Sequence, residues 1–391
     1  MTTHINCGRK KIAVVATSPK MVRYFLVFHI LRFTELYDVV VITNYADQSE
    51  NLDIFPDNVK KYNIPIVRDI NIFLDCKALL FLIYYFYREK ITLVYSISPK
   101  GGLLSMMASK FLSVPVRMHT FTGQVWFARK GITRWLLKMM DRITSLLSTV
   151  VIVDSPSQRE YLVEHKVVTH KKSLVIGNGS ISGVDTKRFH PSKDVREVIR
   201  EKVSIQNSTI VFLFVGRLKK DKGIFELINA FTNISPQKKI SLWFVGDDEE
   251  DILKNIKTIE SAKRYSIEFL PFTTIPEEYM QAADVFCLPS YREGFGSTII
   301  EAAACGIPAI GSRIYGITDA IIDGETGILV EKGNVHELAS AMLEMAENDY
   351  LRKKMGAYAM KVAIEKFKPD YISKELVSIL KKQLIQAEIV R

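Results

Sequence analysis

The sequence predicts an α/β protein with two doubly wound, Rossmann-like domains that face a cleft. Two observations carry this prediction: apolar β-branched runs alternate with amphipathic helical patterns, and the alternation restarts after a glycine-rich stretch. The chain has 391 residues, which is long for a single core and suits two domains of about 150–200 residues each. Domains of this kind bind ligands at the carboxyl ends of their parallel strands.

Short apolar runs predict the strands, and periods of three or four residues predict the helices between them. In the first half, strands are expected at 11–17, 38–44, 91–98, 114–121 and 148–155, with a helix at 22–35. In the second half, strands are expected at 209–217, 240–247, 266–272, 283–290, 307–312 and 326–330, with a helix at 223–234.

The stretch Gly177–Pro191 holds three glycines and no apolar period, so it is the best linker candidate. We therefore expect a first domain over 1–180 and a second over 181–365. The residues 366–391 include an amphipathic helix, which we expect to pack back on the first domain.

The charge of the chain points to anionic partners. The formal net charge is +10, and no Asp or Glu occurs from Lys90 to Met140. This segment is either a solvated basic face or a face turned to anionic lipid. The apolar run 78–88 is too short to span a bilayer, which needs about 20 residues, so it is a buried or an interfacial helix.

The amino-terminal residues lack the long apolar region of a signal peptide, and the four cysteines are far apart. Both features fit a reducing cytosol. No aromatic-basic RNA motif or helix-turn-helix pattern is present, so we expect no nucleic acid partner.

A cationic loop follows the strand expected at 209–217. Gly216 permits a tight turn, and Arg217 and Lys222 can then point from one loop at a diphosphate. An ordinary charged surface is the alternative.

The stretch "REGFGSTIIEAAACG" follows the strand expected at 283–290. Backbone amides at the helix start, around Ser297 and Thr298, favour an anion, and Gly294 and Gly296 let a ligand approach the backbone. Glu301 can accept bonds from the vicinal hydroxyls of a ribose or a sugar. In the alternative, Ser297 only caps the helix and Glu301 is buried or ion-paired. Together with the cationic loop, the stretch describes a nucleotide-diphosphate pocket.

Three segments, "VGRLKKDKG", "EYMQAADVFCLPSYREGFGSTIIEAAACGIPAI" and "DGETGILV", resemble the second domain of retaining glycosyltransferases of family 4, which have the GT-B fold. The two glutamates Glu293 and Glu301 match the E-x7-E pattern of that family. The segment "SPKGGLLSMMASKFLSVPVRMHTFTG" is similar to the first domain of bacterial members that build surface polysaccharides, such as lipopolysaccharide or capsule.

The resemblance implies a hexosyltransferase whose first domain binds the acceptor and whose second binds the nucleotide sugar. Arg217, Lys222 and the amides of Ser297 and Thr298 would bind the donor diphosphate, and Glu301 the ribose. Glu293, Gly294 and the amides of Phe295 and Gly296 would hold the donor sugar.

Two further sites complete the expectation. The loop at Pro271 and Phe272 is placed to read a base edge with its backbone. His119, which we expect just after a strand over Val114–Met118, would lie at the reacting centre and orient the donor sugar by the family likeness.

The loop after the first strand departs from the glycine-rich pattern of the family. Thr17, Ser18 and Lys20 are the polar candidates there, and Lys100, Gly101 and Gly102 are further candidates for acceptor or first-loop contacts.

We expect no metal and no other cofactor. The acidic run Gly246–Asp251 is better explained as solvated acids at a helix start. The expected acceptor is a lipid-linked saccharide at the cytoplasmic face of the membrane, with the protein bound peripherally to that anionic surface. A UDP-sugar 2-epimerase of similar fold and a basic nucleic-acid-binding protein are the competing functions.

Overall fold

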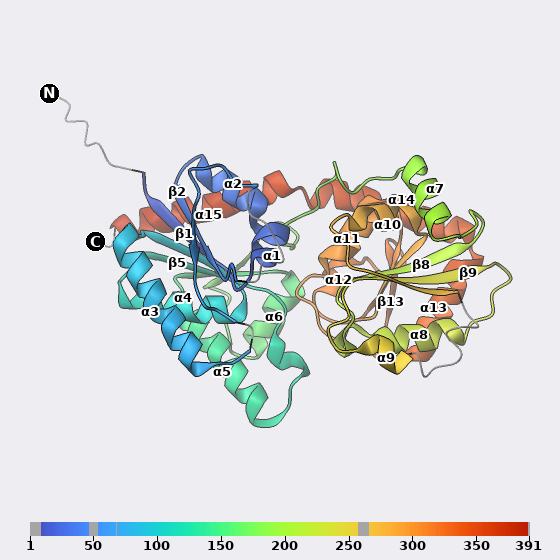
Figure 1. Ribbon diagram of the computed structural model, residues 1–391, viewed down its shortest axis with the longest axis horizontal. Coiled ribbons are helices and arrows are strands. Elements are labelled where there is room, and N and C mark those ends of the chain that lie inside the picture. Colours follow the sequence, from blue (N-terminus) through green and yellow to red (C-terminus); the bar gives the residue numbers. More distant parts are fainter. Residues whose placement is uncertain (1–8, 47–53, 68, 257–265, 390–391) are drawn as a thin grey trace. The chain divides into compact units, whose positions relative to one another are not determined.

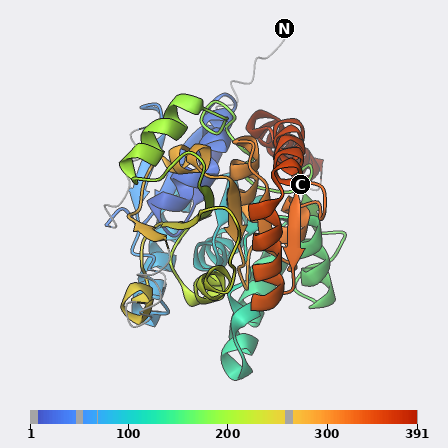
Figure 2. The same ribbon diagram turned by 90° about the vertical axis from the view of Figure 1, so that its right-hand side faces the viewer.

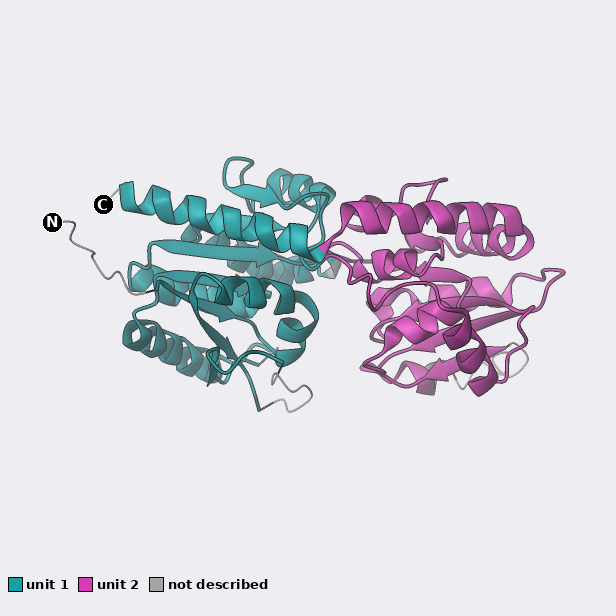
Figure 3. Cartoon of the chain, turned by 90° about the horizontal axis from the view of Figure 1, so that it is seen from above, with its two compact units in different colours: residues 1–182, 369–391 teal, residues 183–368 magenta. Residues whose placement is uncertain are grey.

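The computed structural model describes residues 9–46, 54–67, 69–256 and 266–389. The chain divides into two compact units, which Figure 3 distinguishes by colour. The N-terminal unit comprises Met1–Ser182 and Pro369–Arg391, and the C-terminal unit comprises Gly183–Lys368. The chain thus leaves the first unit inside the glycine-rich stretch and returns to it for its last helix.

The described part of the N-terminal unit contains a parallel sheet with the strand order β3-β2-β1-β4-β5-β6-β7. Its strands are β1 (Lys11–Val15), β2 (Asp38–Thr43), β3 (Lys60–Asn63), β4 (Leu93–Ile97), β5 (Val116–Phe121), β6 (Val150–Val153) and β7 (Ser173–Val175). Its helices are α1 (Pro19–Met21), α2 (Val27–Thr34), α3 (Ile72–Glu89), α4 (Pro99–Phe111), α5 (Gly131–Leu147), α6 (Pro156–Glu164) and α15 (Pro369–Ile389). Helix α4 packs between α3 and α5, and α2 packs against α15 (Figure 1).

The described part of the C-terminal unit contains a second parallel sheet with the order β10-β9-β8-β11-β12-β13. Its strands are β8 (Ile210–Val215), β9 (Ile240–Val245), β10 (Ile267–Leu270), β11 (Val285–Leu288), β12 (Ala309–Ser312) and β13 (Gly327–Val330). Its helices are α7 (Lys193–Lys202), α8 (Ile224–Thr232), α9 (Ile252–Ile256), α10 (Pro276–Ala282), α11 (Ser297–Ala304), α12 (Ile317–Ala320), α13 (Val335–Glu347) and α14 (Asp349–Lys366). Helices cover both faces of this sheet (Figure 2): α8 packs with α13, and α11 packs with α14.

The predicted doubly wound α/β class is confirmed, because both sheets are parallel and the strand order of each reverses at an internal switch point. Two strands of the N-terminal sheet are not predicted from the sequence. Strand β3 reads Lys-Lys-Tyr-Asn, which has no apolar run, and β7 is only three residues long. The helix expected over 22–35 instead opens with a π-helical segment, Val22–Leu26, before α2.

Helix α15 closes the N-terminal unit. It buries Ile372, Leu376 and Leu380, which recur at helical spacing, in one core with strands β1, β2 and β4. The buried His29 of α2 fixes the start of this helix. Its Nε2 donates to the carbonyl of Ile181 at 2.5 Å, and its Nδ1 accepts from the Ser373 hydroxyl at 3.0 Å. Burial lowers the pKa of His29 to about 4, so the ring is neutral at physiological pH.

Glu89, at the end of α3, is a buried carboxylate that predicts acid sensitivity of the N-terminal unit. Bonds from the Tyr62 hydroxyl, Lys60 and Lys11 hold its anion and lower its pKa to about 2. The stabilisation is present above the unfolded value near 4.5 and is lost as the pH falls toward 2. We expect Glu89→Gln to lower the free energy of unfolding by about 1–3 kcal/mol at pH 7 and by much less at pH 2.5. Urea unfolding at both pH values measures this, and an equal loss at both would contradict it.

Candidate functional site

Two loops of the C-terminal unit meet at the carboxyl edge of its sheet. Strands β8 and β11 are neighbours in the sheet, so the loops that follow them run side by side. They approach so closely at Gly223 that a Cβ there would lie 2.2 Å from the carbonyl oxygen of Pro289. Gly223 also has a φ of +72°, which favours glycine. The cationic loop and the glutamate stretch therefore form one site.

Lys222 and Glu293 bridge the two loops. The Lys222 Nζ lies 2.5 Å from Glu293 Oε1, and the Ser290 hydroxyl donates to the same oxygen at 2.9 Å. The two charged side chains are only 15% and 16% exposed. Such a partly desolvated pair is electrostatically stronger than an exposed one. The structure thus joins two residues that the sequence places in separate motifs.

A second layer of contacts holds these loops in register. Arg292 pairs with Asp221 at 3.1 Å, and the Tyr291 hydroxyl donates to Glu226 at 2.7 Å. The Tyr291 amide also donates to the carbonyl of Asp221 at 2.8 Å. None of these four residues was predicted to belong to the site. Asp221 and Arg292 each stand next to a predicted site residue, and this adjacency is the sequence signal that could have identified them.

Arg217 does not share a partner with Lys222. It pairs with Glu249 at 3.3 Å, and Lys219 pairs with the same carboxylate at 2.8 Å. Glu249 belongs to the acidic run after β9, which neighbours β8 in the sheet. The contact between this acidic run and the cationic loop could not be predicted from the sequence, because it depends on the order of the strands in the sheet.

The same acidic run starts helix α9, as expected. The Asp248 carboxylate accepts from the amides of Ile252 at 2.7 Å and Leu253 at 2.9 Å. Within residues 9–46, 54–67, 69–256 and 266–389, no group of three or more His, Cys, Asp or Glu is arranged to hold a metal ion.

Helix α11 begins at Ser297, directly after the Glu293 loop. Gly296 occupies the N-cap position with φ of +77° and, having no side chain, caps none of the helix amides. The first amides of the helix, those of Ser297 and Thr298 included, lack an intrahelical acceptor and can bind an anion. Ser297 and Thr298 are partly exposed, whereas Gly294 and Gly296 are buried. Phe295 is also buried and packs its ring against Phe367.

Glu301 lies one turn into α11. Burial raises its pKa to about 8, against the opposing charge of Arg188, and Glu277 raises it further. Arg188 is engaged with Glu277 at 2.7 Å, which reduces its effect on Glu301. At neutral pH the Glu301 carboxyl is largely protonated, so it can both donate and accept a hydrogen bond.

Glu301→Gln is therefore expected to stabilise the protein at alkaline pH. The pKa of Glu301 is raised from 4.5 to about 8 in the folded chain. Native stability then declines as the pH rises from about 4.5 through 8. Because Gln mimics the protonated acid, the free energy of unfolding of the variant should exceed that of the native protein by about 1–3 kcal/mol at pH 9 and should equal it at pH 4.5. Chemical denaturation at both pH values tests this, and a destabilised variant at pH 9 would refute it.

Pro271 and Phe272 follow β10 at the same sheet edge, two strands from β8. Both are exposed, and the Phe272 side chain is 42% exposed. Their place after the edge strand agrees with the position of the predicted loop.

His119 corrects the sequence interpretation. We expected it just after a strand, but β5 runs through Phe121, so His119 lies inside the strand and pairs with Ser96 of β4 and Val151 of β6. The side chain is 1% exposed, and its Nδ1 contacts the Ser96 hydroxyl at 2.9 Å. Burial lowers the pKa of His119 to about 3, so the imidazole is neutral. Two β-branched or aromatic residues, Thr120 and Phe121, extend the strand.

Gly101 and Gly102 are likewise not part of a loop. They lie in the first turn of α4 and are buried. A Cβ on Gly102 would lie 2.3 Å from the His119 ring, so this glycine makes room for the histidine. The neighbouring Lys100 pairs with Asp75 at 2.8 Å and donates to the Asp69 carbonyl, so it is tied to the start of α3. These three residues are explained by packing within the unit.

Ser18 and Lys20 remain candidates in the loop and short helix that follow β1. Ser18 precedes α1 in an extended conformation, its side chain makes no cap bond, and both residues are partly exposed. Beside them, the Thr17 and Ser98 hydroxyls are bonded at 2.5 Å, which joins the ends of β1 and β4.

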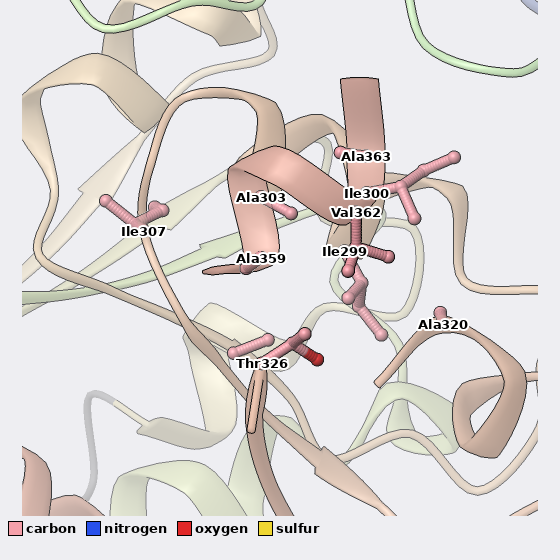
Figure 4. Close-up of a pocket in the computed structure, with 10 residues that line it drawn as sticks. Ile299, Ile300, Ala303, Ile307, Ala320, Thr326, Ala359, Val362 and Ala363 are labelled. Carbon is pink, nitrogen blue, oxygen red and sulfur yellow. The ribbon is translucent and has the colours of Figure 1, made fainter. Parts of the chain in front are cut away.

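A small apolar pocket is lined mainly by residues of α11 and α14 (Figure 4). It is lined by Ile299, Ile300 and Ala303 of α11 and by Ala359, Val362 and Ala363 of α14, with Thr326 among the others. No charged side chain lines it, so it is a packing gap between two helices and not a place for a diphosphate.

Comparisons with known proteins identify the family of this chain. The family model described as "Glycosyl transferases group 1" matches residues 195–362. The chain is 31% identical over 334 residues to the capsular polysaccharide biosynthesis glycosyltransferase CapM of Staphylococcus aureus, covering 85% of this chain and 87% of that protein.

It is also 26% identical over 309 residues to the UDP-Gal:alpha-D-GlcNAc-diphosphoundecaprenol alpha-1,3-galactosyltransferase of Escherichia coli, covering 76% and 78% of the two chains. Among solved structures, sucrose-phosphate synthase from Thermosynechococcus elongatus superposes with a TM-score of 0.80 at 20% identity, over 97% of this chain and 100% of that one. This likeness shows the GT-B fold.

The matched segment 195–362 contains both loops and the start of α11, so the family match falls on the site itself. The predicted enzyme class, a glycosyltransferase, is confirmed. With its two doubly wound units, its bridged cationic and acidic loops, and a close relative over most of its length, the chain belongs to the group 1 glycosyltransferases.

Proposed function

We propose that this enzyme transfers a hexose or an N-acetylhexosamine from a UDP-sugar to a polyprenyl-diphosphate-linked saccharide in surface polysaccharide synthesis. The Lys222–Glu293 bridge next to the start of α11 carries the donor half of the proposal. It sets a cation for phosphate and a carboxylate for sugar hydroxyls side by side. Two relatives support the donor and acceptor classes. One is a capsule enzyme, and the other is a galactosyltransferase named for UDP-Gal and a diphosphoundecaprenol-linked sugar.

When the donor binds, Lys222 would contact its diphosphate in place of Glu293. A bound diphosphate carries more negative charge than Glu293, so it competes for the ammonium and leaves the carboxylate free to accept sugar hydroxyls. Arg217 and the amides of Ser297 and Thr298 add donors to the phosphates. Glu301, as a partly protonated acid, binds the ribose diol, and the backbone at Pro271 and Phe272 reads the base.

Transfer breaks the bond between the anomeric carbon and the phosphate oxygen. Negative charge grows on the leaving diphosphate, where Lys222, Arg217 and the α11 amides stabilise it. We propose retention of configuration, with the acceptor attacking the face that the phosphate leaves and giving its proton to that phosphate.

We further propose that transfer needs no metal, because Lys222, Arg217 and the helix amides already supply positive charge to the diphosphate. Full activity in excess EDTA is the expected result. Loss of activity in EDTA with recovery on adding Mg²⁺ or Mn²⁺ would overturn it.

We propose a cytoplasmic location, peripheral on the inner face of the cell membrane. No helix among the described residues is long and apolar enough to cross a bilayer. A lipid-linked acceptor would bring the enzyme to the membrane surface.

One assay tests the function. The protein is incubated with a panel of UDP- and GDP-sugars and a short-chain lipid-diphosphate saccharide, and products are followed by mass spectrometry. We expect a mass increase of one sugar with a UDP donor, and the anomeric coupling of the new linkage in the NMR spectrum then reports retention or inversion. Transfer only to a free sugar, or only from a GDP donor, would overturn the acceptor or the donor assignment.

A further inference from the structure

Helix α5 buries its polar side chains and exposes its apolar ones. Asp141, Thr144 and Ser145 are at most 6% exposed. Five large apolar residues of the same helix are exposed, by 84%, 61%, 42%, 38% and 76% in chain order: Ile132, Trp135, Leu136, Ile143 and Leu146. A helix on the surface of a protein in water normally shows the opposite arrangement. Figure 1 shows α5 beside α4 in the N-terminal unit.

The buried polar face is satisfied, so the orientation of α5 is fixed by the fold. The Asp141 carboxylate accepts from Trp126 Nε1 at 2.8 Å, and Thr144 donates to the carbonyl of Met140 at 2.9 Å. Trp126 in turn stacks on Tyr161 at 5.4 Å. Rotating the helix to bury its apolar face would break the buried Asp141–Trp126 bond and leave both groups unpaired.

The exposed apolar residues form one continuous stripe. From Ile132 to Leu146 they are spaced by three, one, seven and three residues, which places all five on a single helical face. At 1.5 Å per residue the stripe is about 20 Å long. We call these five residues the α5 stripe. The neighbouring helices α3 and α4 also expose large apolar side chains, among them Leu80 and Phe111.

Basic residues flank α5. Arg129 and Lys130 are exposed just before the helix, whereas Arg134 and Lys138 are partly buried and lie over the ring of the buried Trp126, at 5.7 Å and 5.6 Å. Among the residues that the structure describes, none of these four makes an ion pair. The whole segment from Lys90 to Met140 contains no Asp or Glu. A second copy of the chain would bring these like charges together in a two-fold dimer, whereas anionic lipid complements them.

We propose that the α5 stripe inserts into the headgroup–acyl boundary of an anionic bilayer, with the exposed Arg129 and Lys130 at the lipid phosphates. An amphipathic helix with basic residues at its start and an aromatic residue on its apolar face suits this interfacial position. The inference rests on the proposed membrane-facing function for its choice of partner. It names the surface that makes the contact, which neither the family match nor the relatives supply.

The chain carries its own reporter for this contact. Of its three tryptophans, Trp126 and Trp243 are buried, and Trp135 is 61% exposed on the α5 stripe. We expect vesicles of phosphatidylglycerol and phosphatidylcholine to shift the Trp135 emission to the blue, and brominated acyl chains to quench it. Vesicles of phosphatidylcholine alone should give little change, and salt should weaken the binding.

Matched variants separate the stripe from general surface effects. Ile132→Ser with Leu146→Ser should weaken partitioning into the anionic vesicles by about tenfold or more, because two inserted aliphatic side chains are lost. Val198→Ser with Tyr350→Ser removes two similarly exposed apolar side chains from the C-terminal unit and should leave binding unchanged. Arg129→Gln with Lys130→Gln should weaken binding and its salt dependence, whereas Lys353→Gln with Lys354→Gln in α14 should not.

These outcomes are independent of sugar transfer, because the binding experiments contain neither donor nor acceptor. Vesicle binding without any transfer would sustain the inference and count against the proposed function. Transfer to a water-soluble acceptor without vesicle binding would do the reverse. Equal binding by the stripe variant and its control would overturn the inference. The inference would also be overturned if Trp135 were protected from solvent without lipid in a concentration-dependent way and sedimentation showed a dimer. A second copy of the chain would then cover the α5 stripe.

Discussion

Replacing Lys222 with alanine is expected to lower kcat/KM for sugar transfer by about 100- to 1,000-fold while the protein stays folded. The structure places the ammonium against Glu293, at 2.5 Å from its carboxylate. Its loss removes charge stabilisation from the leaving diphosphate and leaves Glu293 without its ionic partner. Initial rates with the donor found in the sugar panel measure the effect, and circular dichroism checks the fold.

Lys254→Ala is the matched control for Lys222. Lys254 is in the same unit, carries the same charge and pairs with Asp251 at 2.7 Å, but its side chain is 77% exposed. The control variant should keep the rate of the native enzyme. If Lys222→Ala also keeps that rate, the diphosphate does not bind at the Lys222–Glu293 bridge. Glu293→Gln adds a second check, because it should lose transfer while retaining the Ser290 contact through an amide oxygen.

Replacing Arg200 with alanine is expected to destabilise the C-terminal unit by about 3–5 kcal/mol. The Arg200 side chain is 1% exposed and pairs with Asp284 at 2.6 Å. Its other donors bond to the backbone carbonyls of Ala282, Gln206, Asn207 and Thr209. Removing the guanidinium leaves these buried acceptors unpaired and opens a cavity between α7 and the start of β8.

Arg196→Ala provides the comparison for Arg200, because Arg196 binds the same Asp284 at 2.7 Å from a more exposed position, with 28% of its side chain accessible. We expect this control to cost about 1 kcal/mol. Guanidinium unfolding followed through the buried Trp243 of β9 measures both variants. If Arg200→Ala does not express, Arg200→Lys tests the same point, since an ammonium reaches fewer of these acceptors. Equal midpoints for the Arg200 and Arg196 variants would contradict the prediction.

Most of the fold could be predicted because its signals are local. A buried parallel strand such as β8, Ile210–Val215, is a run of apolar residues, and the helix that follows it has its own period. The failures also have local causes. Strand β3 is polar and lies at the sheet edge, so neither composition nor period marks it. The strand predicted over 114–121 ends where β5 ends, but His119 was assigned to a position after the strand, because a histidine inside a strand looks the same in the sequence as one that follows it.

The candidate site could be predicted in its parts but not in its contacts. Arg217, Lys222, Glu293 and the start of α11 were found because each follows a strand end, and parallel strands bring those ends to one edge. The supporting residues Asp221, Glu226 and Tyr291 were missed. Their roles exist only once β8 and β11 are neighbours, and that order is a property of the whole sheet.

By itself, the sequence determined the α/β class, the order of most strands and helices along the chain, and the residue types offered to a nucleotide sugar, since spacing and strand-end position follow from the chain alone. Only the tertiary structure decided which charges meet. Lys222 and Glu293 are 71 residues apart, and strand order makes them partners. The tertiary structure also determines that His119 is buried against Gly102. It determines as well that the apolar face of α5 is exposed, because the Asp141–Trp126 bond fixes the buried face of that helix.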